Sequence, residues 1–150
     1  MTLNLTFRVD GIPVQQGSKR HVGNGIMVEA AKGLKSWRQE AIDAAIRAKR
    51  ESGMEFPLNG PVACTVTFTF PMPASRPKWM RDMAWSPKTT TPDLDKLTRA
   101  IGDSLEQAKV VSSDARIWRW NVEKVESWTR TAGVTVVVTD QSDMVSRGTA

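Results

Sequence analysis

A segment in the middle of the chain alternates between apolar and polar side chains, and this alternation constrains the fold more than any other feature. Its apolar positions are Val62, Cys64, Val66, Phe68 and Phe70. A period of two is the pattern of a β-strand with one buried face. The segment therefore predicts a strand that crosses the centre of a sheet, and its apolar face requires a covering layer.

Two other segments have the period of a helix. Between residues 29 and 49 and between residues 94 and 108, apolar side chains recur every three or four positions, which predicts amphipathic helices. Gly53 and Pro57 end the first of them. These helices are the expected covering layer of the sheet.

Further strands are predicted at residues 3–9, 118–122 and 133–140, where apolar residues alternate or valines cluster. In the second of these, Trp118 and Trp120 are expected to share one face, in the core or in a dimer interface. The order strand, helix, strand, helix, strand, strand implies an α/β (α+β) fold with a mixed β-sheet and two main helices packed on it.

The length of 150 residues suits one domain, since domains usually have roughly 100–200 residues. We assign it to residues 1–140 and expect a flexible C-terminal tail at 141–150. No apolar run approaches the ~18–20 residues that span a bilayer, and no signal peptide is expected. The single cysteine, Cys64, excludes an internal disulfide and reads as a core residue, so we expect a reduced, cytoplasmic location.

The charge balance favours a polyanionic partner. Lysine and arginine outnumber aspartate and glutamate by 21 to 16, and the net charge is +5. Many cations fall in two segments without periodicity, residues 15–27 and 71–91, which predict a basic loop or hairpin and a long basic loop. In the second loop, Trp79 and Trp85 either stack on bases or anchor the loop to the core.

Two aspartates, Asp93 and Asp95, open the second predicted helix. On a regular helix they would point about 200° apart, but in an extended segment they would share a face. Two close carboxylates repel unless a cation lies between them, and Mg²⁺ is commonly held in this way. Asp114, after the helix, is a candidate third ligand. The alternative is that the acids only decorate a helix N-terminus, where they favour the dipole.

Arg99 follows Asp95 by one helical turn. An ion pair at this spacing would stabilise the helix by ~0.3–0.5 kcal/mol. The functional alternative is that Arg99 neutralises charge on a phosphorus centre under attack. Thr91 and Pro92 are the expected cap and first-turn proline of this helix, and Asp103 is expected to be a solvated charge on its polar stripe.

The stretch PDLDKLTRAIGDSLEQAKVVSSDARI resembles the RusA-type Holliday junction resolvases of bacteria and phages. The family pattern is Pro-Asp-Leu-Asp-Asn-Leu, then a lysine, a helix ending in Asp-x-Leu, and an acidic pair before a strand. Asp93 and Asp95 match the first acids, Asp103 matches the helix end, and Asp114 matches the last acid. Weaker agreement extends over about residues 3–125.

The chain departs from the family pattern at three positions. Lys96 replaces the asparagine, Arg99 replaces the lysine, and Ser113 replaces the first acid of the second pair. The three acids implied to bind metal are intact. Arginine keeps the positive charge of the family lysine, but it stays protonated, whereas the pKa of a lysine can shift. Lys96 is therefore an alternative source of the ammonium group that the family lysine supplies.

The resemblance implies a homodimeric, Mg²⁺-dependent endodeoxyribonuclease, with Mn²⁺ as a possible substitute, that resolves four-way DNA junctions by paired symmetric nicks. It implies metal binding by Asp93, Asp95 and Asp114, and catalysis by these acids with Arg99. We expect no organic cofactor and no membrane partner. We expect the protein to be encoded by a phage or prophage. The alternative is a catalytically inactive phage accessory protein that binds branched DNA. The expected DNA contacts are Lys19, Arg20, Arg76, Lys78, Arg81, Lys88 and Lys96.

Overall fold

The computed structural model describes residues 3–15 and 24–146, and five strands in this part form one mixed sheet. The sheet order is β1-β5-β2-β4-β3, so the segment with the clearest alternation lies at the centre, as predicted. β2 pairs with β4 in parallel, and the other neighbours are antiparallel. The strands are β1 Leu3–Asp10, β2 Val62–Pro71, β3 Ser86–Pro87, β4 Ile117–Ser127 and β5 Gly133–Asp140.

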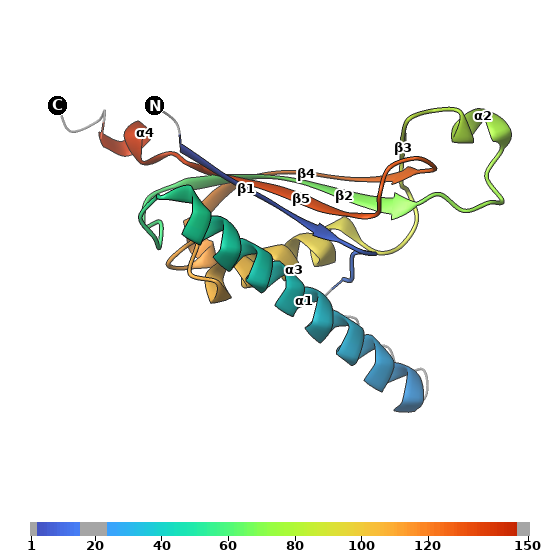
Figure 1. The fold of residues 1–150 in the computed structure, drawn as a ribbon, viewed down its shortest axis with the longest axis horizontal. Coiled ribbons are helices and arrows are strands. Elements are labelled where there is room, and N and C mark those ends of the chain that lie inside the picture. The colour runs from blue at the N-terminus through green and yellow to red at the C-terminus, as the bar shows by residue number, and fades with distance from the viewer. Residues whose placement is uncertain (1–2, 16–23, 147–150) are drawn as a thin grey trace.

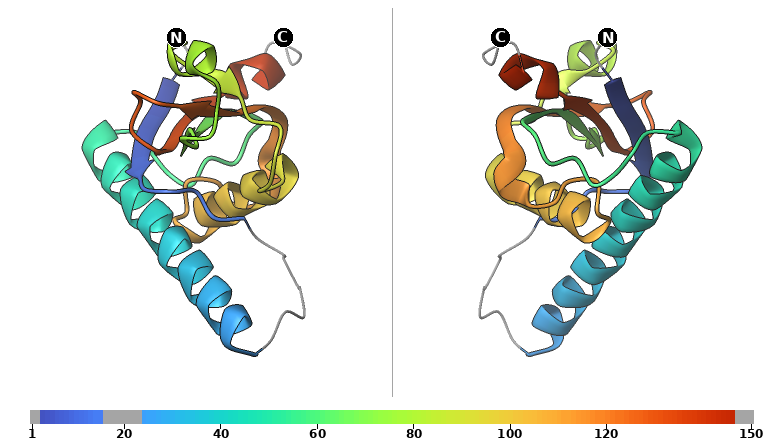
Figure 2. Two further views of the ribbon diagram at one scale, coloured as in Figure 1. Left: turned by 90° about the vertical axis from the view of Figure 1, so that its right-hand side faces the viewer. Right: turned by 90° about the vertical axis from the view of Figure 1, so that its left-hand side faces the viewer.

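The two long helices, α1 and α3, lie on the same face of the sheet (Figure 1), and the end-on views of Figure 2 show only short helical segments, green and red, on the opposite side. α1 packs against β1 and α3, and α3 packs against β4. This is the predicted α+β architecture. The helices are α1 Asn24–Ser52, α2 Lys78–Arg81, α3 Leu94–Gln107 and α4 Ser142–Ser146, with a short 3-10 helix η1 at Asp114–Arg116.

The core fills the space between the sheet and these helices. The alternating side chains of β2 face it, and Val62, Cys64, Val66 and Phe68 are at most 1% exposed. Burial raises the pKa of the Cys64 thiol to about 12, which fits a small core residue and not a nucleophile.

One strand departs from simple alternation. The pairing of β4 with β2 shifts register between Val62 and Ala63, which leaves Trp118 as an extra residue in β4. Ile117 and Trp120 pack against the core, whereas Trp118 is 53% exposed. The prediction that Trp118 and Trp120 share a face is therefore wrong, because a bulge reverses the alternation between them.

The segment 71–91 is more ordered than the sequence predicted, since it contains α2 and β3. Arg76 Nε donates to the buried Glu126 carboxylate at 2.7 Å, and Ser127 Oγ donates to the Ala84 carbonyl at 2.7 Å. These contacts fasten the segment to β4. It is not a plain loop, and in Figure 1 it projects from one end of the sheet.

Three predicted boundaries differ from the structure. The first helix begins at Asn24, so the basic loop predicted at 15–27 ends earlier, and its residues 16–23 lie outside the described residues. The second helix begins at Leu94, two residues later than its predicted proline start. In the expected tail, residues 142–146 form α4, and the Gln141 N–H donates to the Pro61 carbonyl at 2.9 Å.

Candidate active site

The acid pair lies where the chain enters α3. Asp93 is the N-cap residue with extended backbone (φ −73°, ψ 135°), and Asp95 follows in the first helical turn. The predicted strand-like start is therefore limited to Asp93, because Asp95 already belongs to the helix, and Thr91 and Pro92 are not the cap and first helical residue. The cap takes this place because Asp93 is the last residue with extended dihedral angles.

The Asp93 carboxylate does not cap the helix. An N-cap aspartate normally accepts a hydrogen bond from an N–H of the first turn, but Asp93 makes no side-chain cap bond. Its one ion pair among the described residues is with Lys96, whose Nζ lies 3.5 Å from Oδ2, and about half of the side chain is exposed. The structure therefore lacks the hydrogen bond that a capping role for Asp93 would require. The carboxylate faces solvent beside the Lys96 ammonium group.

Asp95 and Arg99 are both exposed on α3. The i,i+4 ion pair that their spacing allows is not formed: in the part of the chain that the structure describes, neither side chain has an ion-pair partner. Asp103, the expected solvated charge, instead lies 3.9 Å from the Arg38 guanidinium of α1. The Asp95 carboxylate and the Arg99 guanidinium are thus both accessible to a ligand.

Two side chains that the sequence did not single out hold the start of α3. The Asp93 N–H donates to Gln15 Oε1 at 2.8 Å. Lys124 Nζ donates to the Thr90 carbonyl at 2.6 Å and to the Pro92 carbonyl at 2.7 Å. No local motif marks these contacts, because Gln15 and Lys124 are distant in sequence from the acids that they flank.

Asp114 lies at the other end of α3. Its N–H donates to Glu106 Oε1 at 3.1 Å, in the last turn of the helix. A rise of 1.5 Å per residue puts the turn of Glu106 about 16 Å from that of Asp95. Across residues 3–15 and 24–146, no group of three or more His, Cys, Asp or Glu side chains is close enough to hold a metal. The acid pair and Asp114 do not meet within one chain.

The donor chemistry of the pair suits a hard cation. Asp93 and Asp95 offer exposed carboxylate oxygens, which are the ligands that Mg²⁺ takes, usually with water and substrate phosphate completing its shell. One or two protein carboxylates are typical for this ion. The pair therefore fits a Mg²⁺ site, with Asp114 absent from it in a single chain.

Two of the predicted DNA contacts are engaged within the protein. Arg76 forms an ion pair with Glu126, and the hydrogen bond and charge of that carboxylate raise the pKa of Arg76. Lys88 lies 5.1 Å from the centre of the Phe70 ring and donates to Thr90 Oγ1, and burial lowers its pKa. Arg76 and Lys88 therefore both have structural roles within the protein that do not involve DNA.

The other predicted contacts in the described residues range from exposed to half-buried. Lys78 is exposed at the start of α2, and the Arg81 guanidinium lies 5.4 Å from the centre of the Trp128 ring. Lys96 pairs with Asp93, as described above. Trp79 and Trp85 are 66% and 41% exposed, so they do not anchor their segment in the core. Lys19 and Arg20 lie outside the described residues.

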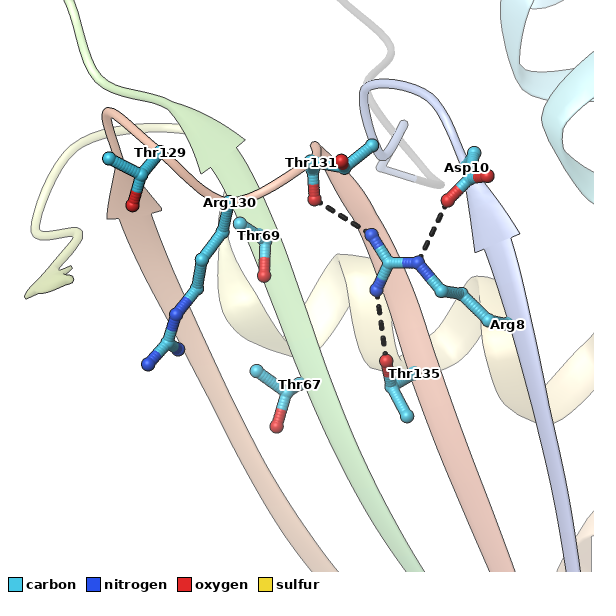
Figure 3. A pocket seen from close by; sticks show the side chains of 8 residues that line it. All are labelled: Arg8, Asp10, Thr67, Thr69, Thr129, Arg130, Thr131 and Thr135. Carbon is cyan, nitrogen blue, oxygen red and sulfur yellow. Dashed lines mark hydrogen bonds and ion pairs between the residues drawn. The ribbon is translucent and has the colours of Figure 1, made fainter. Parts of the chain in front are cut away.

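A hollow of about 760 Å³ lies on the sheet face opposite α1 and α3, and the sequence did not indicate it (Figure 3). Arg8 crosses it and is held by Asp10 Oδ1 at 2.8 Å, Thr135 Oγ1 at 3.0 Å and the Thr131 carbonyl at 2.7 Å. Threonines and Arg130 form much of the remaining wall. The acids of α3 are on the other side of the sheet, so this hollow is not part of the candidate active site.

The fold and the site together define a class: an α+β protein with an exposed acid pair beside cationic side chains, which suits phosphodiester chemistry. Residues 10–139 match the sequence profile of the family Endodeoxyribonuclease RusA. The chain belongs to this family, and membership supports an endodeoxyribonuclease role at Holliday junctions. No curated protein sequence matches the chain at a significant level.

None of the described helices combines the length and the apolar character that crossing a bilayer demands.

Proposed function

We propose that the protein is a Mg²⁺-dependent endonuclease that resolves four-way DNA junctions by paired symmetric nicks. The observation that carries the proposal is the start of α3. Asp93 and Asp95 are both exposed there, and the Asp93 carboxylate makes no capping hydrogen bond to the helix. The family match over residues 10–139 supports branched DNA as the substrate.

Asp93 and Asp95 would hold the metal, which when bound supplies an activated water and a polarised phosphate. Arg99 lies one turn further along α3 and carries a guanidinium group. It would neutralise the charge that builds on the phosphate during attack. The Lys96 ammonium group, which lies beside Asp93, is the alternative for this role. Neither role requires proton transfer by Arg99, so replacement of the family lysine by arginine is compatible with activity.

We further propose a homodimer in which each site combines the acid pair of one subunit with Asp114 of the partner subunit. The turn of Asp95 lies about 16 Å along α3 from the turn of Glu106, the residue that Asp114 contacts, so one chain does not bring the three acids together. A two-fold axis that runs perpendicular to α3, near its middle, would bring one end of this helix beside the opposite end of its copy. Two identical sites related by that axis suit symmetric cuts.

The segment that carries α2 is the proposed DNA-binding surface beside the sites. Exposed Lys78 would contact phosphates, and exposed Trp79 and Trp85 would stack on bases that open at the branch point. Base stacking on aromatic side chains is worth ~1–3 kcal/mol per base in single-strand binders. The Arg76–Glu126 ion pair holds this surface in place before DNA arrives.

A second function follows from two departures in the site, Arg99 and Ser113. If the family lysine must transfer a proton, this protein binds junctions without cutting them. Binding that persists in EDTA, together with no nicking in Mg²⁺, distinguishes this function from the first.

Mixing two inactive variants tests the shared site. Asp95→Asn and Asp114→Asn homodimers should both be inactive, whereas their heterodimer keeps one intact site if the acids come from different subunits. The mixture should therefore nick one strand of a junction without the paired second cut. A site made within one chain predicts no activity in the mixture. Asp43→Asn, an exposed change on α1, is the control for carboxylate removal and should retain paired cutting.

A further inference from the structure

Lys124 lies on β4 with its side chain on the helix-covered face of the sheet. Its neighbour across the parallel pairing is Phe68, which is fully buried in the core. The ammonium group reaches the carbonyls of Thr90 and Pro92 at 2.6 and 2.7 Å. The Lys124 carbonyl also accepts the Lys88 N–H at 3.1 Å. Lys124 of β4 thus contacts three of the five residues that precede Asp93, namely Lys88, Thr90 and Pro92.

The start of α3 needs such support because it lacks a side-chain cap. Without an oxygen from Asp93 on the first-turn N–H groups, the position of the helix start is set by contacts from outside the helix. Those contacts are Lys124, on the carbonyls before Asp93, and Gln15, on the Asp93 N–H. The arrangement leaves the Asp93 carboxylate free of the capping role.

We infer that Lys124 is a positioning residue for the acid pair. The inference rests on the proposed metal-dependent function. Lys124 forms no ion pair with either carboxylate among the described residues, so it acts through the backbone of Thr90 and Pro92. Groups that orient metal ligands from behind typically contribute 10–100-fold to metal affinity or activity.

The chain contains a matched lysine at the opposite end of the same helix. Lys49 of α1 is also half-buried, and its Nζ donates to the carbonyls of Ala108 and Lys109 at 2.8 and 3.3 Å. Removing the ammonium from Lys49 therefore frees two backbone carbonyls at the C-terminal end of α3. It leaves the contacts at Asp93 in place, so it controls for loss of stability.

The experiment compares Lys124→Met, Lys124→Arg, Lys49→Met and the wild type. Mn²⁺ binding to the protein without DNA is measured from the electron paramagnetic resonance signal of free Mn²⁺. Hydrogen exchange of the Asp93 amide is measured by NMR, and thermal unfolding shows that each variant is folded. Arginine keeps the N–H donors, so a folded Lys124→Arg variant that loses Mn²⁺ affinity also overturns the inference, and this outcome remains available if the methionine variant does not fold.

We expect Lys124→Met to bind Mn²⁺ about 10-fold more weakly and to exchange the Asp93 amide faster. We expect Lys49→Met and Lys124→Arg to stay near the wild type in both measurements. Unchanged Mn²⁺ affinity in Lys124→Met, or an equal loss in Lys49→Met, overturns the inference while the proposed function stands. A wild type that binds no Mn²⁺ overturns both, and the amide exchange then shows separately whether Lys124 holds the helix start.

Discussion

Gly102 lies in the middle of α3, the helix that carries the acid pair, and replacing it with alanine should stabilise the protein. A Cβ at this position would lie 3.5 Å from Cζ2 of Trp120, which is an ordinary van der Waals contact. Alanine is about 0.8–1.0 kcal/mol more favourable than glycine within a helix. We therefore expect Gly102→Ala to raise the free energy of unfolding by about 1 kcal/mol, or about 2–4 °C in Tm for a domain of this size.

Urea unfolding followed by tryptophan fluorescence measures this change. Gly33→Ala in α1 is the matched control, because its Cβ would meet nothing within 4 Å and it isolates the helix propensity. Gly102→Leu should be destabilising by about 1–3 kcal/mol, since atoms beyond Cβ would overlap the Trp120 ring. A loss of stability in Gly102→Ala, with a gain in Gly33→Ala, would refute the packing of α3 on β4 described here.

Three further predictions concern buried polar groups. Arg76→Met should lower Tm more than Glu126→Gln, because it leaves a carboxylate that is 2% exposed without its partner, whereas Arg76 can still reach water; equal Tm values in differential scanning calorimetry would contradict this asymmetry. Cys64 should react with a thiol reagent at pH 8 only as fast as the protein unfolds. Because its pKa is about 12 in the folded state and 9.0 in the reference state, the thiol stabilises the fold fully below pH 9 and progressively less as the pH rises toward 12. Denaturant titrations across that range should show this decline, and Cys64→Val should lack its share of it.

Periodicity predicted most of the fold because burial repeats along each element. The alternation of β2 identified the central strand, and the predicted range 133–140 coincides with β5. The prediction failed at Trp118, where a bulge inserts one residue and reverses the faces. A bulge depends on pairing with β2, which is a contact between segments distant in sequence, so the local pattern of β4 carries no sign of it.

The candidate site was predicted in part. The acids were proposed from their spacing, and the backbone is extended at Asp93 but already helical at Asp95. The supporting residues Gln15 and Lys124 were missed, because a lysine that donates to backbone carbonyls looks like any surface lysine in the sequence. The separation of Asp114 was also missed, since its position depends on the length and direction of α3.

The basic segments show that charge alone does not reveal the structural role of a cation. Arg76 and Lys88 were chosen for their charge, yet one holds Glu126 and the other lies over an aromatic ring. Both interactions join residues far apart in the chain. Exposed Lys78 and Trp79 remain the better candidates for contact with a junction.

The central claim is that this protein cuts four-way junctions in a metal-dependent reaction at the acid pair. The most direct test is a nicking assay on a synthetic four-way junction and on a linear duplex of the same sequence, in Mg²⁺ and in EDTA, with the wild type and Asp95→Asn. We expect paired symmetric cuts that are confined to the junction, require Mg²⁺ and disappear in the variant. Tight junction binding without any cut, or cutting that survives in Asp95→Asn, would contradict this claim.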